Sequence, residues 1–118
     1  MHWQSIPALV AAGLMVVIGL GAMVRPSTLE MVGISTSTPL GRSEVRAVFG
    51  GMFVALGMAC MLTREPIVFA VVGAAWLTDV AVRIVAIFID RVPAREALAV
   101  LAIGGAMGAA LLSGYWFA

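Results

Sequence analysis

The sequence predicts an all-α integral membrane protein: a four-helix up-down bundle with a short interfacial helix after the first span. The chain has 118 residues and is 63% hydrophobic and 11% charged, whereas a soluble domain is about 45–50% apolar and ~25% charged. Four apolar stretches cover about 5–24, 44–62, 67–89 and 93–117, each near the ~20 residues that a transmembrane helix needs. Most charges lie between these stretches or at their ends, so we expect one four-span domain over 1–118.

The first stretch, 5–24, lacks a basic flank and is too long for the apolar part of a signal peptide, so we expect a retained helix. Pro26 should end it at Arg25, because proline disfavours helical backbone in the preceding residue. The segment 27–30 has the spacing of a capping box, and Gly33 is suited to stop the helix that follows. This pattern predicts a short amphipathic helix at the membrane surface.

The other spans also begin at residues that favour the first turn of a helix. Ser43 is a good N-cap for the second span, and Glu44 is favourable in its first turn. Pro66 suits the first position of the third span, and 90–93 forms a similar link before the fourth. Links this short predict antiparallel neighbours and therefore the up-down order.

The arginines predict the orientation. Five of them lie on the side of the first and third connections: Arg25, Arg42, Arg46, Arg91 and Arg95. Arg64 lies on the opposite side. The positive-inside rule places the five in the cytoplasm and both termini outside. Trp3, Tyr115, Trp116 and Phe117 would then form an outer aromatic belt.

Asp79 and Arg83 interrupt the third apolar stretch. A charge at the centre of a spanning helix costs about 2.5–3.5 kcal/mol, so a partner or a function is expected. On a helix, Asp79, Arg83 and Asp90 share one stripe with Trp76. An Asp four residues before an Arg also has the favourable order for a pair within the helix.

The strongest polar cluster combines the start of the second span with the end of the third span. It predicts an intramembrane network, neutralised between adjoining helices, of Glu44, Arg46, Asp79, Arg83 and Asp90. Two interpretations stay open. The charges fix the helix register, or they line a polar cavity for an anion, a headgroup, a quinone or a proton.

Small residues recur at helical spacing in the second and fourth spans and predict close helix packing, within the chain or between chains. They are Ala47, Gly50, Gly51, Ala55, Gly57, Ala59, Ala102, Ala106, Ala110 and Gly114.

Several kinds of chemistry are disfavoured. A lone His2 outside the apolar stretches cannot complete a catalytic triad, and as a terminal residue it is more often solvated than a metal ligand. Lysine is absent, which excludes Schiff-base chemistry. The single Cys60 permits no internal disulfide and is expected to pack in the helix. We therefore expect no catalytic residues, no metal, no cofactor and no nucleic-acid partner.

The stretch 43–51, SEVRAVFGG, followed by Gly57, resembles the bacterial family catalogued as domain of unknown function 4345, whose pattern here is E-x-R-A-x-(Y/F)-G-G. The family then has an Arg late in the third span, matched by Arg83, and an Asp-Gly pair at its end. Asp90 matches the aspartate, and Arg91 replaces the glycine. The resemblance covers nearly the whole chain and implies a four-helix inner-membrane protein with no established activity.

The sequence supports three hypotheses for function. The first is an accessory or structural subunit, or stabiliser, of a larger membrane complex, in contact with the bilayer and with other subunits or a second copy. The alternative is a small transporter, or a lipid- or quinone-binding protein, that uses the Asp79–Arg83 stripe. A membrane enzyme resembling the four-span DoxX-like redox proteins is less favoured, because nothing visibly ligates a cofactor.

Overall fold

The computed structural model describes residues 6–116, and every regular element among them is a helix. The elements are α1 (Ile6–Val24), the 3₁₀ helix η2 (Pro26–Val32), α2 (Pro39–Glu44), the π-helix η3 (Val45–Met52), α3 (Phe53–Thr63), α4 (Pro66–Ile89) and α5 (Ala94–Trp116). Because α2, η3 and α3 are continuous, they form one helix, Pro39–Thr63. Four helices are thus long and apolar enough to cross a membrane, which indicates a multi-pass membrane protein.

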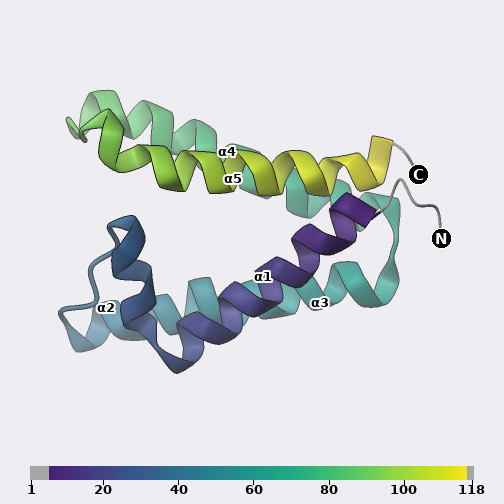
Figure 1. Cartoon of the computed structure of the whole chain (residues 1–118), viewed down its shortest axis with the longest axis horizontal. Helices are drawn as coiled ribbons and strands as arrows, with labels where there is room; N and C mark the ends of the chain where they lie inside the picture. Colours follow the sequence, from purple (N-terminus) through teal and green to yellow (C-terminus); the bar gives the residue numbers. More distant parts are fainter. Residues whose placement is uncertain (1–5, 117–118) are drawn as a thin grey trace.

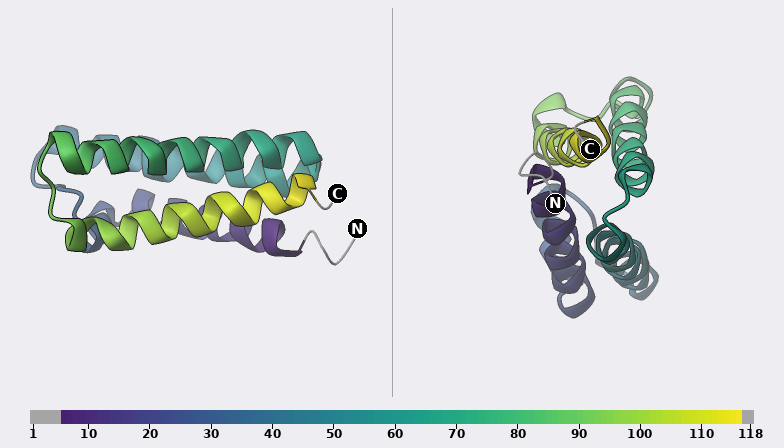
Figure 2. Two further views of the ribbon diagram at one scale, coloured as in Figure 1. Left: turned by 90° about the horizontal axis from the view of Figure 1, so that it is seen from above. Right: turned by 90° about the vertical axis from the view of Figure 1, so that its right-hand side faces the viewer.

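The four long helices form two pairs. One pair is α1 with the η3–α3 helix, and the other is α4 with α5 (Figure 1). Contacts between α1 and α5 do most to join the pairs, while α3 and α4 touch little. The end-on view in Figure 2 shows one pair above the other.

The two pairs are not parallel. They lie close together where α1 begins and α5 ends, and they diverge toward the opposite end, where η2 and α2 lie (Figure 1). Successive long helices run in opposite directions along the 43 Å axis of the molecule. The molecule therefore has one closed end and one open end.

The closed end holds the main apolar core. Its buried residues come from α1, α3, α4 and α5: Ala8, Ala11, Ala12, Met15, Cys60, Phe69, Val72, Met107 and Leu111. A second, smaller cluster of Ala22, Leu29 and Val45 attaches η2 to α1 and to the start of η3. Most contact between the pairs is thus confined to one end.

Glycines allow the backbones of α1 and the second helix to touch. A β-carbon added to Gly57 would lie 2.7 Å from the carbonyl oxygen of Ala12, and one added to Gly19 would lie 2.8 Å from that of Gly50. Real β-carbons do not approach carbonyl oxygens so closely, so larger residues would force the helices apart. In lipid, close packing of this kind replaces the hydrophobic effect as the force between helices.

The second helix begins earlier than predicted from the sequence. Its N-cap is Thr38, whose hydroxyl accepts a hydrogen bond from the backbone N–H of Gly41 at 2.9 Å, and Pro39 follows at the first helical turn. Ser43, the predicted cap, lies inside the helix and donates to the Leu40 carbonyl. Proline at the first turn has its backbone angle already set for a helix and lacks the N–H that would go unpaired there, which explains the earlier start.

The short helix predicted after the first span is present as η2, but its predicted capping box is not. Thr28 donates to the carbonyl of Arg25, and Glu30 accepts from Thr36 beyond the helix. The predicted stop at Gly33 is confirmed, because Gly33 has φ +87° and caps the helix. The predicted end of α1 before Pro26 is confirmed as well.

Candidate binding cleft

A cavity of about 570 Å³ lies between the two helix pairs, toward their open end. Residues of α1, η2, η3, α3, α4 and α5 line it, and nearly all of them are apolar. Its size falls within the range of small-molecule sites, which are typically apolar with a few polar groups that orient the ligand. The cleft is therefore the strongest candidate site in the described part of the chain.

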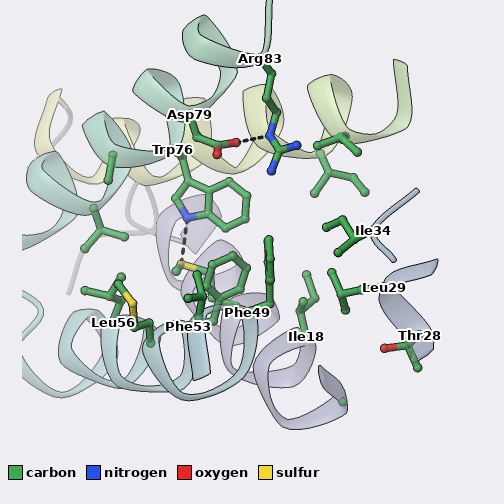
Figure 3. Close-up of a pocket in the computed structure, with 18 of the residues that line it drawn as sticks. Ile18, Thr28, Leu29, Ile34, Phe49, Phe53, Leu56, Trp76, Asp79 and Arg83 are labelled. Carbon is green, nitrogen blue, oxygen red and sulfur yellow. Dashed lines mark hydrogen bonds and ion pairs between the residues drawn. The ribbon is translucent and has the colours of Figure 1, made fainter. Parts of the chain in front are cut away.

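One wall of the cleft is aromatic (Figure 3). The ring centroids of Phe49 and Phe53 lie 5.6 Å apart at 66°, and those of Phe53 and Trp76 lie 5.1 Å apart at 52°. These separations fall within the range of favourable aromatic pairs. The second helix and α4 thus contact each other across the cleft through rings.

Trp76 has a weak hydrogen-bond partner. Its indole Nε1–H points to the sulfur of Met15, at 3.2 Å (Figure 3). A thioether is a poor acceptor, so a carbonyl oxygen from a bound molecule would be a better partner for this N–H. The indole is only partly buried and lines the cavity.

Asp79 and Arg83 form the polar part of the cleft. Arg83 Nε donates to Asp79 Oδ2 at 2.7 Å, and the side chains are 32% and 45% exposed for Arg83 and Asp79, respectively. Figure 3 shows the terminal amino groups of Arg83 pointing toward the cavity. Neither of them donates to another group within residues 6–116. The pair is thus electrically balanced while its outer hydrogen-bonding positions stay free.

The second helix has an unusual backbone where it lines the cleft. Val45–Met52 is a π-helix, and Val48, Phe49 and Met52 from this segment face the cavity. π-helical turns are rare and occur frequently at functional sites. The segment also contains Gly50, which is buried against α1. The altered winding thus coincides with the residues that shape the cleft.

The η2 helix and the loop after it lie at the open end of the cleft. Thr28, Leu29, Met31 and Ile34 line the cavity there. Two hydrogen bonds brace the loop that follows η2: Thr36 donates to Glu30, and Arg42 Nη1 donates to the carbonyl of Thr36 at 3.2 Å. The lining at the edge of the opening is therefore largely apolar, and a hydrogen-bonded loop supports it.

The structure brings together only part of the predicted polar network. Within residues 6–116, the one ion pair joins Asp79 and Arg83 inside α4. Glu44 and Asp90 are exposed, and Arg46 donates to the carbonyl oxygen of Met23. The predicted neutralisation between helices is thus replaced by neutralisation within one helix, because the pairs diverge at this end and the spacing of four residues already brings the two charges together.

The predicted packing residues are buried, partly buried or exposed. Gly50, Gly57 and Gly114 are buried at helix contacts, and Ala110 is partly buried beside the main core. Gly51 and Ala59 are partly buried, while the exposed residues are Ala47, Ala55, Ala102 and Ala106. Gly73 was not predicted from its spacing, yet an added β-carbon there would lie 3.1 Å from the Gly108 carbonyl oxygen.

The aromatic wall was also missed, apart from Trp76. Phe49 and Phe53 are four residues apart in a helix, and this spacing puts two rings on one face. It is the signal in the sequence that could have identified them. Which face points toward α4 depends on the π-helix, which no residue pattern in the segment predicts.

The comparisons with known proteins identify no relative. No protein-family profile matches the sequence, and neither a curated protein nor a solved structure shows significant similarity to it. Function is therefore inferred from the geometry of the cleft.

Proposed function

We propose that this chain is a four-span up-down protein of the bacterial inner membrane that takes a lipophilic molecule from the bilayer into the cleft between its two helix pairs. The observation that carries the proposal is the cleft itself: a largely apolar, partly aromatic cavity with one balanced ion pair, between helices of membrane length. This favours the binding or transport hypothesis over the accessory subunit.

Three features support a binding role. Charged residues are rare within membrane spans and mark functional positions there. The pair lies on the face of α4 that lines the cavity, not on the outer face. The cleft also lies near the open end, so a molecule can enter without separating the core at the closed end.

The positions of the arginines support an orientation with both termini in the periplasm. Arg25, Arg42 and Arg46 lie at or near the open end, as does the α4–α5 link with Arg91. Arg64 lies in the link between α3 and α4, at the closed end. In this orientation the cleft opens toward the cytoplasmic side. The resemblance to domain of unknown function 4345 agrees with this proposal and stays a prediction.

The binding role can be tested with a cleft-filling variant and a matched control on the same helix. Both Ala74 and Ala75 are exposed, but only Ala75 lines the cavity. We expect the fluorescent apolar probe 1-aminoanthracene to bind saturably to the protein in lipid nanodiscs. Ala75→Phe should abolish this binding, and Ala74→Phe should preserve it. Equal binding by both variants would show that the probe does not occupy the cleft and would remove the proposal.

A second candidate is the accessory subunit. It is favoured by the small residues that face outward on two helices, Ala47 and Ala55 on one and Ala102 and Ala106 on the other. Such faces permit close approach of another transmembrane helix. Native mass spectrometry of the protein extracted in mild detergent tests this role: a co-purifying membrane subunit supports it, and a lone monomer or homodimer under all conditions counts against it.

A further inference from the structure

We propose that the molecule taken up by the cleft is uncharged and planar, with carbonyl groups on its ring and a long apolar tail: a compound of the quinone class. This inference rests on the proposed function and narrows it, because the cleft has the wrong charge for an anionic lipid and the right surfaces for a flat ring.

The balance of charge is the first argument. Asp79 and Arg83 are the charged residues that line the cavity, and they form an ion pair with each other. Their charges cancel, so the site has no surplus positive charge for a phosphate or carboxylate. An anion near Arg83 would also meet the negative charge of Asp79, and this repulsion is strong where the dielectric constant is low. An uncharged head avoids the repulsion.

The free hydrogen-bonding positions are the second argument. Arg83 uses Nε for the ion pair, so its terminal N–H groups remain donors toward the cavity (Figure 3). Asp79 uses Oδ2 and keeps Oδ1 as an acceptor within the described structure. A quinone carbonyl can accept from the guanidinium, and the hydroxyl of the corresponding quinol can donate to the carboxylate. One pair of side chains thus suits both forms of the compound.

The rings are the third argument. Phe49, Phe53 and Trp76 form a continuous aromatic wall beside the polar pair (Figure 3). Flat rings pack favourably against such walls in offset or edge-to-face arrangements. The weakly bonded N–H of Trp76 lies on the same face of α4 as the ion pair, one turn from Asp79. It offers a carbonyl oxygen a further donor.

The depth of the site is the fourth argument. Arg83 lies six residues before Ile89, where α4 ends, which is about 9 Å along the helix. The phosphate of a phospholipid would have to leave the polar surface of the bilayer to reach it. A quinone ring, being uncharged, resides within the apolar region already. Its tail can follow the apolar lining, which includes Leu56 and Val72.

The experiment measures displacement of 1-aminoanthracene from the protein in nanodiscs of zwitterionic phosphatidylcholine. The competitors are decylubiquinone and a pair that differs in charge, cis-parinaric acid and its methyl ester. We expect decylubiquinone to displace the probe, and the methyl ester to compete better than the acid. Arg83→Gln should lower the affinity for decylubiquinone by about tenfold, as expected for the loss of one charge-assisted hydrogen bond. Arg95→Gln, on the exposed start of α5, should leave it unchanged.

Asp79→Asn provides an independent variant. It removes the negative charge and leaves Arg83 positive, so the preference should change in favour of cis-parinaric acid. A probe that binds but is not displaced by decylubiquinone would overturn this inference and leave the proposed function standing. A wild-type protein that prefers the acid to its ester would overturn the inference in the same way. A probe that never binds the wild-type cleft would remove both proposals.

Discussion

Arg46 Nη1 donates a hydrogen bond to the carbonyl oxygen of Met23 at 2.6 Å. Because α1 ends at Val24, this carbonyl lies in the last turn of the helix, where carbonyl groups lack an N–H partner within the helix. A side chain from the π-helix thus caps a different transmembrane helix. The positive guanidinium also lies near the negative end of the α1 dipole.

Arg46→Ala should therefore destabilise the protein, because it leaves a terminal carbonyl of α1 without its charged donor. We expect a loss of about 1–2 kcal/mol, at the lower end for hydrogen bonds to charged groups because this one is exposed. Thermal unfolding in detergent, followed by circular dichroism, measures the change. Arg95→Ala removes an exposed arginine from α5 and is the control; an equal effect of both would contradict the capping role.

Gly57→Ala should separate α1 from α3. The added β-carbon would lie 2.7 Å from the Ala12 carbonyl oxygen and 2.8 Å from a methyl group of Val16. We expect a destabilisation of about 1–3 kcal/mol, as for other overpacked contacts, measured by thermal unfolding in detergent. Gly13→Ala is the matched control, since its β-carbon would meet no atom within 4 Å. That change should be neutral or stabilise the helix by up to about 1 kcal/mol.

Arg91→Gly should stabilise the protein. Arg91 has φ +55°, in the left-handed region, which costs a residue with a side chain roughly 1–2 kcal/mol relative to glycine. We expect a gain of about 0.5–1 kcal/mol in unfolding free energy, part of the cost being offset by the greater freedom of glycine in the unfolded chain. Ala106→Gly, at an exposed position in the middle of α5, should change the stability in the opposite direction.

The Asp79–Arg83 pair should behave as a unit in the membrane. Asp79→Asn or Arg83→Gln leaves one charge without its partner, which costs up to about 2.5–3.5 kcal/mol at the centre of a span. The double variant removes both charges. We expect each single variant to accumulate less in membranes, and to unfold at a lower temperature, than the double variant. If the unfolding temperature of the double variant falls by the sum of the two single decreases, the charges act independently.

The proposed orientation predicts which residues are accessible from the periplasm. In a Cys60→Ser background, Glu65→Cys lies at the closed end and Ser37→Cys at the open end. A membrane-impermeant maleimide added to intact spheroplasts should label the first and leave the second unlabelled until the cells are lysed. The reverse pattern would place the cleft on the periplasmic side.

Much of the fold could be predicted from the sequence because membrane spans have simple signals. Length and apolarity identify the four helices. Pro26 marks the end of α1, Pro66 marks the start of α4, and Gly33 marks the end of η2, each through its own backbone preference. The prediction from Ser43 was wrong because a serine can also lie inside a helix, where its hydroxyl donates to an earlier carbonyl, here that of Leu40. The choice between Thr38 and Ser43 depended on Pro39, which favours the earlier start.

The site was harder to predict than the fold. The spacing of Asp79 and Arg83 predicts their pairing, which a single helix determines. The network between helices required α4 to lie against the start of the second helix, and no local pattern indicates that the two helix pairs diverge. The direction of the face formed by Ala47 and Ala55 could not be predicted either. Their regular spacing is visible in the sequence, but they point outward because glycines on the same helix make the contact with α1.

The divergence of the helix pairs at one end makes the protein asymmetric across the bilayer. In the proposed membrane orientation, only the leaflet beside η2 would meet the cleft, while the other leaflet would meet the packed contact of Gly114 with Ala8. A molecule dissolved in that other leaflet must first cross the bilayer before it can be captured. The proposed binding role therefore implies that the chain samples the contents of a single monolayer.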